Sequence, residues 1–147
     1  MSWQVLLRTN RVRPHATSKN ELQGLRELIA RDLTDAALVA LSADRRFATA
    51  YNAVLQLTKM TIACAGYRVV GAGHHQTTFE ALEIALGASI APTVNYFDAC
   101  RRKRNLVDYD LANVATDTEA EELLRTAEQF RQTVEAWIAQ HHPHLTP

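Results

Sequence analysis

The stretch DRRFATAYNAVLQLTKMTIACAGYRV, residues 44–69, predicts a long amphipathic α-helix. Glycine and proline are scarce between residues 25 and 65, which suits long helices. Side chains recur at helical spacing along one side of this segment, namely Phe47, Tyr51, Val54, Leu55, Thr58, Ile62 and Ala65. We expect the helix to span roughly residues 43–65, with Gly66 ending it.

The same periodicity predicts helices on both sides of this segment. We expect them from residue 19 into the thirties (an extension to 41 stays open), at 78–87, from about residue 92 onward, and at 119–140. The run GYRVVGAGHH, residues 66–75, contains three glycines and is predicted to be a loop, and no segment alternates with period two. The pattern predicts an all-α, antiparallel bundle of four to five helices with short connections.

Three helix starts are predicted from capping boxes, in which a Ser or Thr precedes a Glu by three residues. The pairs are Ser18 with Glu21, Thr77 with Glu80, and Thr118 with Glu121. In each pair, the hydroxyl can accept from one free backbone N–H while the carboxylate reaches back to another.

The formal net charge is zero, with 16 cations and 16 acids, but the charges are distributed unevenly. Residues 1–20 hold four cations and no acid, whereas residues 111–147 hold two cations against six acids. We expect one domain, divided into a basic N-terminal arm (1–17), a helical bundle (18–140) and a solvated tail (141–147). The arm could contact nucleic acid or an acidic partner, be solvated, or pack against the acidic end, and charge alone does not decide.

Composition also limits location and cofactors. No apolar run is long enough to cross a bilayer and the N-terminus lacks signal-peptide order, so we expect a cytoplasmic protein without membrane contact. Cys64 and Cys100 are predicted to be buried, reduced thiols. The chain has no HExxH, CxxC or glycine-rich phosphate loop, and we predict no cofactor and no metal site.

The stretch FDACRRKRNLVDYD, residues 97–110, puts charges on an apolar helix face. On a helical wheel at ~100° per residue, Arg104 and Asp108 fall in the middle of the apolar stripe, Arg101 borders it, and Arg102 falls elsewhere. This pattern fits a buried ion pair, a subunit interface with a polar centre, or a binding cleft. Because the segment holds more cations than Asp108 can pair, we favour the binding of an anionic group by arginine forks.

The order of these motifs resembles the HEPN superfamily of small helical domains. The resemblance covers most of residues 18–140 and rests on the DA at 35–36, the stretch at 44–69, the GHH at 73–75 and RRKRNLVDYD at 101–110. It implies an antiparallel bundle that commonly forms a homodimer. Active members of the family are metal-independent endoribonucleases with a motif of Arg, four to six residues, and His.

Carried over to this chain, the motif arginine is Arg104, the polar residue after it is Asn105, and the histidine position is Tyr109. These three are the candidate catalytic residues, although a tyrosine phenol with a pKa near ~10 is a poor base at neutral pH. Arg104 and Tyr109 lie ~140° apart on an ideal helix. They can share one site only if the helix ends near residue 106 or a second subunit supplies one of them.

Further candidate binding residues are Arg101, Asp108 and His74, and His74 is also the candidate general base. Because the resembling fold places the 43–65 helix close to the motif helix, Tyr51 and Asn52 on that helix could touch the site. His74 and His75 are adjacent, which does not suit two ligands on one helix face. We keep His74 as the candidate because the histidines follow flexible glycines and the resemblance places them at the start of a helix.

Two functions are therefore expected. The first is a HEPN-like helical dimer that binds RNA, a nucleotide or a partner protein, such as a component of a toxin–antitoxin pair. In that class, a small nucleotidyltransferase partner could modify Tyr109. The alternative is a metal-independent endoribonuclease in which Arg104 stabilises the transition state. We prefer the first because the motif histidine is missing.

Overall fold

A computed structural model describes residues 1–71, 74–108 and 112–147 of the chain, and these are mostly helical, as predicted. The described α-helices are α1 (Trp3–Arg8), α2 (Lys19–Ala36), α3 (Ala43–Cys64), α4 (His74–Leu86), α5 (Ala91–Asp108) and α6 (Asp117–His141). Two strands, β1 (Val12–Pro14) and β2 (Tyr67–Val69), and two short 3-10 helices, η1 (Ala88–Ile90) and η2 (Pro143–Leu145), complete the elements. None of the helices in these ranges is both long and apolar enough to cross a bilayer.

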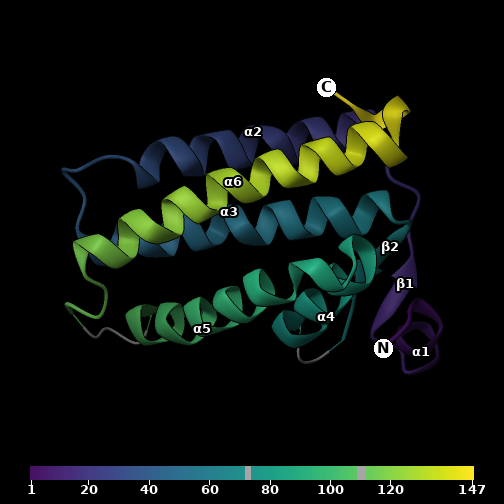
Figure 1. Ribbon diagram of the computed structural model, residues 1–147, viewed down its shortest axis with the longest axis horizontal. Coiled ribbons are helices and arrows are strands. Elements are labelled where there is room, and N and C mark those ends of the chain that lie inside the picture. The colour runs from purple at the N-terminus through teal and green to yellow at the C-terminus, as the bar shows by residue number, and fades with distance from the viewer. Residues whose placement is uncertain (72–73, 109–111) are drawn as a thin grey trace.

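Helix α3 lies at the centre of the bundle, with α2 and α6 on one side and α4 and α5 on the other (Figure 1). Thirteen of its 22 residues are buried, so it is covered on several sides and not only along the predicted stripe. The buried hydroxyls of Thr58 and Thr61 donate to the carbonyls of Val54 and Leu57, each at 2.9 Å. This local bonding lets α3 bury polar side chains without the cost of leaving them unsatisfied.

The small sheet corrects the prediction that residues 66–75 form only a loop. Strand β1 pairs antiparallel with β2, and Val12 stands opposite Val69. Each strand has three residues, which is too short for a period of two to be seen in the sequence. Gly66, with a φ of 98°, makes the turn that leads from α3 into β2.

The segment 1–17, predicted to be an arm, contains α1 and β1 and folds onto the bundle. Leu6 and Val12 are buried in a cluster with Ile62 and Ala81, from α3 and α4. Trp3 stacks on Tyr67 with ring centroids 4.2 Å apart. The basic charges of this segment suggested an arm, although its apolar run WQVLL, residues 3–7, provides the side chains that pack.

Two of the three predicted capping boxes are wrong in position. Helix α4 begins at His74, so Thr77 lies inside it and its hydroxyl accepts from Arg11 Nε at 3.0 Å. At the start of α6 the box is formed by Thr116 and Glu119, two residues before the predicted pair.

Only one of the two hydrogen bonds of the third predicted capping box is formed. The hydroxyl of Ser18 accepts from the N–H of Glu21 at 3.1 Å, which makes Ser18 the N-cap of α2. The Glu21 carboxylate, however, accepts from Thr17 and contacts His15 Nε2 at 2.7 Å. The hydroxyl cap alone is enough to start the helix where the sequence predicts.

Residues 141–147, predicted to be a solvated tail, are only partly solvated: four of the seven residues are exposed, but the segment contains η2 and packs through it. Leu145 in η2 is buried. Arg26 on α2 donates to the carbonyl of Leu145 at 3.0 Å and, through two nitrogens, to the Glu135 carboxylate, each at 2.8 Å. The prediction that Cys64 and Cys100 are buried free thiols is confirmed.

Candidate phosphate-binding site

The cations of α5 differ in the partners they contact. Arg101 donates to Asp98 at 3.0 Å, and Arg102 lies 3.7 Å from the same carboxylate with two thirds of its side chain exposed. Lys103 turns the other way and pairs with Glu119 in the first turn of α6. Lys103 therefore holds α5 to α6, while Arg101 and Arg102 share one acid on their own helix.

Arg104 crosses from α5 to α3. Its Nη2 donates to the side-chain oxygen of Asn52 at 3.2 Å, and its guanidinium carbon lies 5.6 Å from the centroid of the Tyr51 ring. That distance is within the range for a cation–π contact. The prediction that Arg104 turns toward the bundle is consistent with these contacts, and α3 holds the guanidinium in one place.

Tyr51 links the arginine to a third helix. Its ring is fully buried, and its hydroxyl is joined to Nδ1 of His75 on α4 by a hydrogen bond of 3.0 Å. The two rings are nearly parallel, with an interplanar angle of 13°. Helices α3, α4 and α5 thus bring a guanidinium, an amide, a phenol and an imidazole together.

The environment keeps both rings uncharged. Burial raises the pKa of Tyr51 well above its ordinary value of 10.0, although Arg104 and Arg101 oppose the shift. Burial, together with the nearby Arg104 and Arg101 charges, lowers the pKa of His75 below its ordinary value of 6.5. At neutral pH, His75 is therefore a neutral imidazole that can accept a proton.

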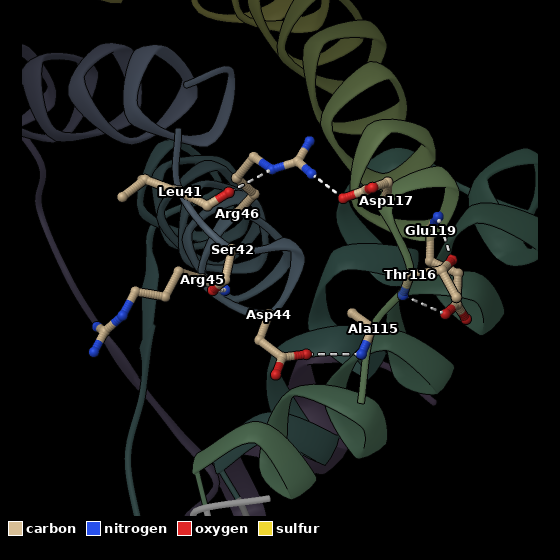
Figure 2. A network of polar contacts seen from close by, with 9 residues as sticks. All are labelled: Leu41, Ser42, Asp44, Arg45, Arg46, Ala115, Thr116, Asp117 and Glu119. Atoms are coloured by element: carbon tan, nitrogen blue, oxygen red, sulfur yellow. Dashed lines mark hydrogen bonds and ion pairs between the residues drawn. The ribbon is translucent and has the colours of Figure 1, made fainter. Parts of the chain in front are cut away.

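The chain that follows α5 is fastened to the start of α3. The Asp44 carboxylate accepts from the backbone N–H groups of Asn113 and Ala115, both at 2.8 Å. Figure 2 shows the bond from Ala115. Thr116 and Glu119 then close the capping box that begins α6. The backbone on the far side of the motif segment is thereby held to the bundle.

A buried arginine completes this attachment. Arg46 is 7% exposed, and it donates to the carbonyl of Leu41 at 3.3 Å and pairs with Asp117 at the start of α6 (Figure 2). Its neighbour Arg45 is exposed and points away from this network. We call the group of Asp44, Arg46, Thr116, Asp117 and Glu119 the α3–α6 clamp.

The remaining residues predicted for the site are not among the contacts of Arg104 described above. Asn105 is half-buried on α5, and His74 is exposed at the first residue of α4. Tyr109 and the side chain of Asp108 lie outside the described residues, so the predicted pair between Arg104 and Asp108 stays a prediction. Helix α5 runs through Asp108, beyond residue 106.

His75 is the residue that sequence reasoning missed. The prediction began the helix at residue 78, which left both histidines in a loop. Extending that helix back by one turn places His75 four residues before the buried Phe79, on the inward side, while His74 stays exposed. Asn52 and Tyr51 were anticipated only through the family resemblance.

A scan against family models, a search of curated proteins and a search of solved structures each found no match. Within residues 1–71, 74–108 and 112–147, no group of three or more His, Cys, Asp and Glu side chains is placed to hold a metal ion.

Proposed function

We propose that the protein is a HEPN-like homodimer that binds the phosphate of RNA or of a nucleotide at the site formed by α3, α4 and α5. The main support is the placement of Arg104, whose guanidinium is positioned by Asn52 and by the Tyr51 ring. A guanidinium held in this way binds a phosphate with little further loss of side-chain entropy. Arg101 lies close enough to shift the pKa values of both Tyr51 and His75. Because Arg101 and Arg102 share the single carboxylate of Asp98, this end of the site keeps a net positive charge.

The experiment is a binding titration with a fluorescently labelled single-stranded RNA of mixed sequence, followed by anisotropy at several salt concentrations. Arg104→Ala should weaken binding by about 10-fold or more and reduce the salt dependence by about one counterion. Arg102→Ala is the matched control, because Arg102 is an arginine of the same helix whose side chain is exposed. Equal losses in the two variants, or no RNA binding by the wild type, would contradict the proposal.

The length of the motif helix supports the dimer in this proposal. Helix α5 continues through Asp108, so it does not end near residue 106, and a second subunit remains as the way to complete the predicted site. Leu106 on the same helix is 48% exposed and offers an apolar contact for a two-fold partner. Light scattering at micromolar concentration should give twice the chain mass, and Leu106→Glu should shift it toward the monomer. A monomeric wild type would refute this part of the proposal.

A second function, metal-independent RNA cleavage, is favoured by His75. A neutral imidazole next to Arg104 could take the proton from a ribose 2′-hydroxyl, a role for which Tyr109 is poorly suited. The 2′-oxygen would then attack the adjacent phosphorus, and the bond to the 5′-oxygen would break. Water would protonate that oxygen, leaving a cyclic phosphate and a 5′-hydroxyl, while Arg104 would stabilise the extra charge on the phosphate.

Incubation of RNA with the protein and a chelator separates the two functions. Intact RNA is the result expected for a binding protein. Cleavage that leaves cyclic phosphate ends, and that disappears in both Arg104→Ala and His75→Ala, would establish the nuclease instead. Cleavage that persists in both variants would point to a contaminating enzyme.

A further inference from the structure

Gly24 is an unexpected residue in the interior of α2. A glycine there destabilises a helix by up to about 1 kcal/mol relative to alanine. A Cβ added at Gly24 would meet no other atom within 4 Å, and its backbone is not in the left-handed region. Neither packing nor backbone conformation therefore requires a glycine at this position.

The missing side chain opens onto a groove. A pocket lies beside Gly24, between α2, α3, β2 and α4. Its volume of about 750 Å³ is within the range of small-ligand sites. Its apolar wall is built from aliphatic side chains of different elements, including Leu25, Leu28, Leu55, Ile62 and Val69. Within this wall, Leu28 is 36% exposed, whereas Ile62 is buried.

The charged residues of the groove favour an anion. Lys59 from α3 and Arg68 from β2 line it, and both are exposed. The acid in the lining, Glu21, already accepts from Thr17 at 2.8 Å and contacts His15 at 2.7 Å. The charge of Lys59 helps to lower the pKa of Glu21, but within the described residues neither the Lys59 nor the Arg68 side chain forms a hydrogen bond or an ion pair. His74 also lines the groove.

We infer that this groove binds a small organic anion with an apolar body, whose acidic group contacts Lys59 and Arg68 while its body lies along Leu25, Leu28 and Leu55. Gly24 provides the space for that body. His75 lines the groove and also belongs to the proposed site, but Arg104 and Asn52 do not line it. The inference rests on Gly24, Lys59 and Arg68, so its test can fail or succeed independently of the Arg104 experiment.

The test uses 8-anilinonaphthalene-1-sulfonate, an anionic aromatic probe whose fluorescence rises on binding, with the full-length protein. Gly24→Leu should weaken probe binding by about 10-fold, because the new side chain fills the groove. Gly24→Ala, the matched control, should bind within about twofold of wild type. The double variant Lys59→Gln/Arg68→Gln should also bind about 10-fold more weakly. The unfolding temperature of each variant verifies that the fold is retained.

Competition with unlabelled compounds then defines the ligand. Decanoate and 2-naphthoate distinguish an extended chain from a flat ring, and displacement of the probe by either one supports the inference. Decanol should compete at least about 10-fold more weakly than decanoate. Failure of both carboxylates, equal competition by decanol, or wild-type probe binding by folded Gly24→Leu would overturn the inference.

Discussion

Two arginines, Arg46 on α3 and Arg104 packed against α3, differ in the groups that they contact. Arg46, at the N-terminal end of α3, joins the α3–α6 clamp and pairs with a carboxylate and a backbone carbonyl. Arg104 approaches α3 further along and meets a neutral amide and a tyrosine ring, next to a histidine of lowered pKa. The clamp joins elements of the fold, whereas the second region gathers groups that can bind and exchange protons.

The difference shows that an arginine turned toward the core does not by itself mark a site. In the α3–α6 clamp, Asp117 balances the charge of Arg46, and the carboxylate of Asp44 is occupied by backbone N–H groups. Around Arg104, the contacts to Asn52 and Tyr51 orient the guanidinium, and the Tyr51 hydroxyl is bonded to His75. The lowered pKa of His75 beside this arginine points to function more strongly than burial does.

The largest effect on stability is expected in the clamp. Arg46→Ala should lower the free energy of unfolding by about 2 kcal/mol, because it removes two charge-assisted hydrogen bonds and a buried aliphatic stem. Arg45→Ala, at the exposed neighbouring position, should change it by less than about 0.5 kcal/mol. Urea unfolding measures both. Similar values for the two variants would mean that the clamp contributes nothing specific.

The hydrogen bond between Tyr51 and His75 should contribute less to the free energy of unfolding than the clamp does. Tyr51→Phe removes the hydroxyl but keeps the ring under Arg104, and it should cost about 1 kcal/mol of unfolding free energy. The same variant should shift the imidazole pKa of His75 when it is followed by NMR. An unchanged pKa and unchanged stability would show that the two rings are not coupled.

A substitution at Gly24 should stabilise the protein, unlike those at Arg46 and Tyr51. Gly24→Ala adds a side chain that meets no neighbour, so it should raise the free energy of unfolding by about 0.5–1 kcal/mol through helix propensity alone. Denaturant unfolding of the two proteins tests this. Destabilisation by alanine would mean that the fold itself requires the glycine.

The smallest expected effect is a dependence of stability on pH. Because the pKa of His75 is lowered in the folded protein, the unfolded chain takes up a proton first as the pH falls. Stability should therefore decrease below about pH 6.5 and level off once the folded histidine is also protonated. His142, whose pKa is also lowered by burial, should contribute in the same sense.

His75→Gln should reduce this decrease, and His142→Gln should remove a separate part of it. Urea unfolding at about pH 7.5 and about pH 5 gives the comparison. If His75→Gln loses as much stability between the two conditions as the wild type does, His75 is not protected from protonation in the folded protein.

Helix periodicity and capping patterns predicted the structure correctly where residues close together in the sequence determine it. The periodicity of residues 43–65 predicts α3 to within a residue, and the hydroxyl of Ser18 starts α2 at the predicted position. They failed at Thr77, whose hydroxyl serves Arg11, 66 residues earlier in the chain. The β1–β2 pairing was missed because each strand gains its hydrogen bonds only from the other.

In the candidate site, too, the sequence predicted only what depends on a single helix. A helical wheel was enough to predict that Arg104 turns toward the bundle and that Arg102 does not, because that property depends only on the period of one helix. The contacts of Arg104 with Asn52 and Tyr51, and the selection of His75 over His74, depend on how three helices pack together. Those contacts join residues that are 24 to 53 positions apart, and the lowered pKa of His75 arises only where they meet.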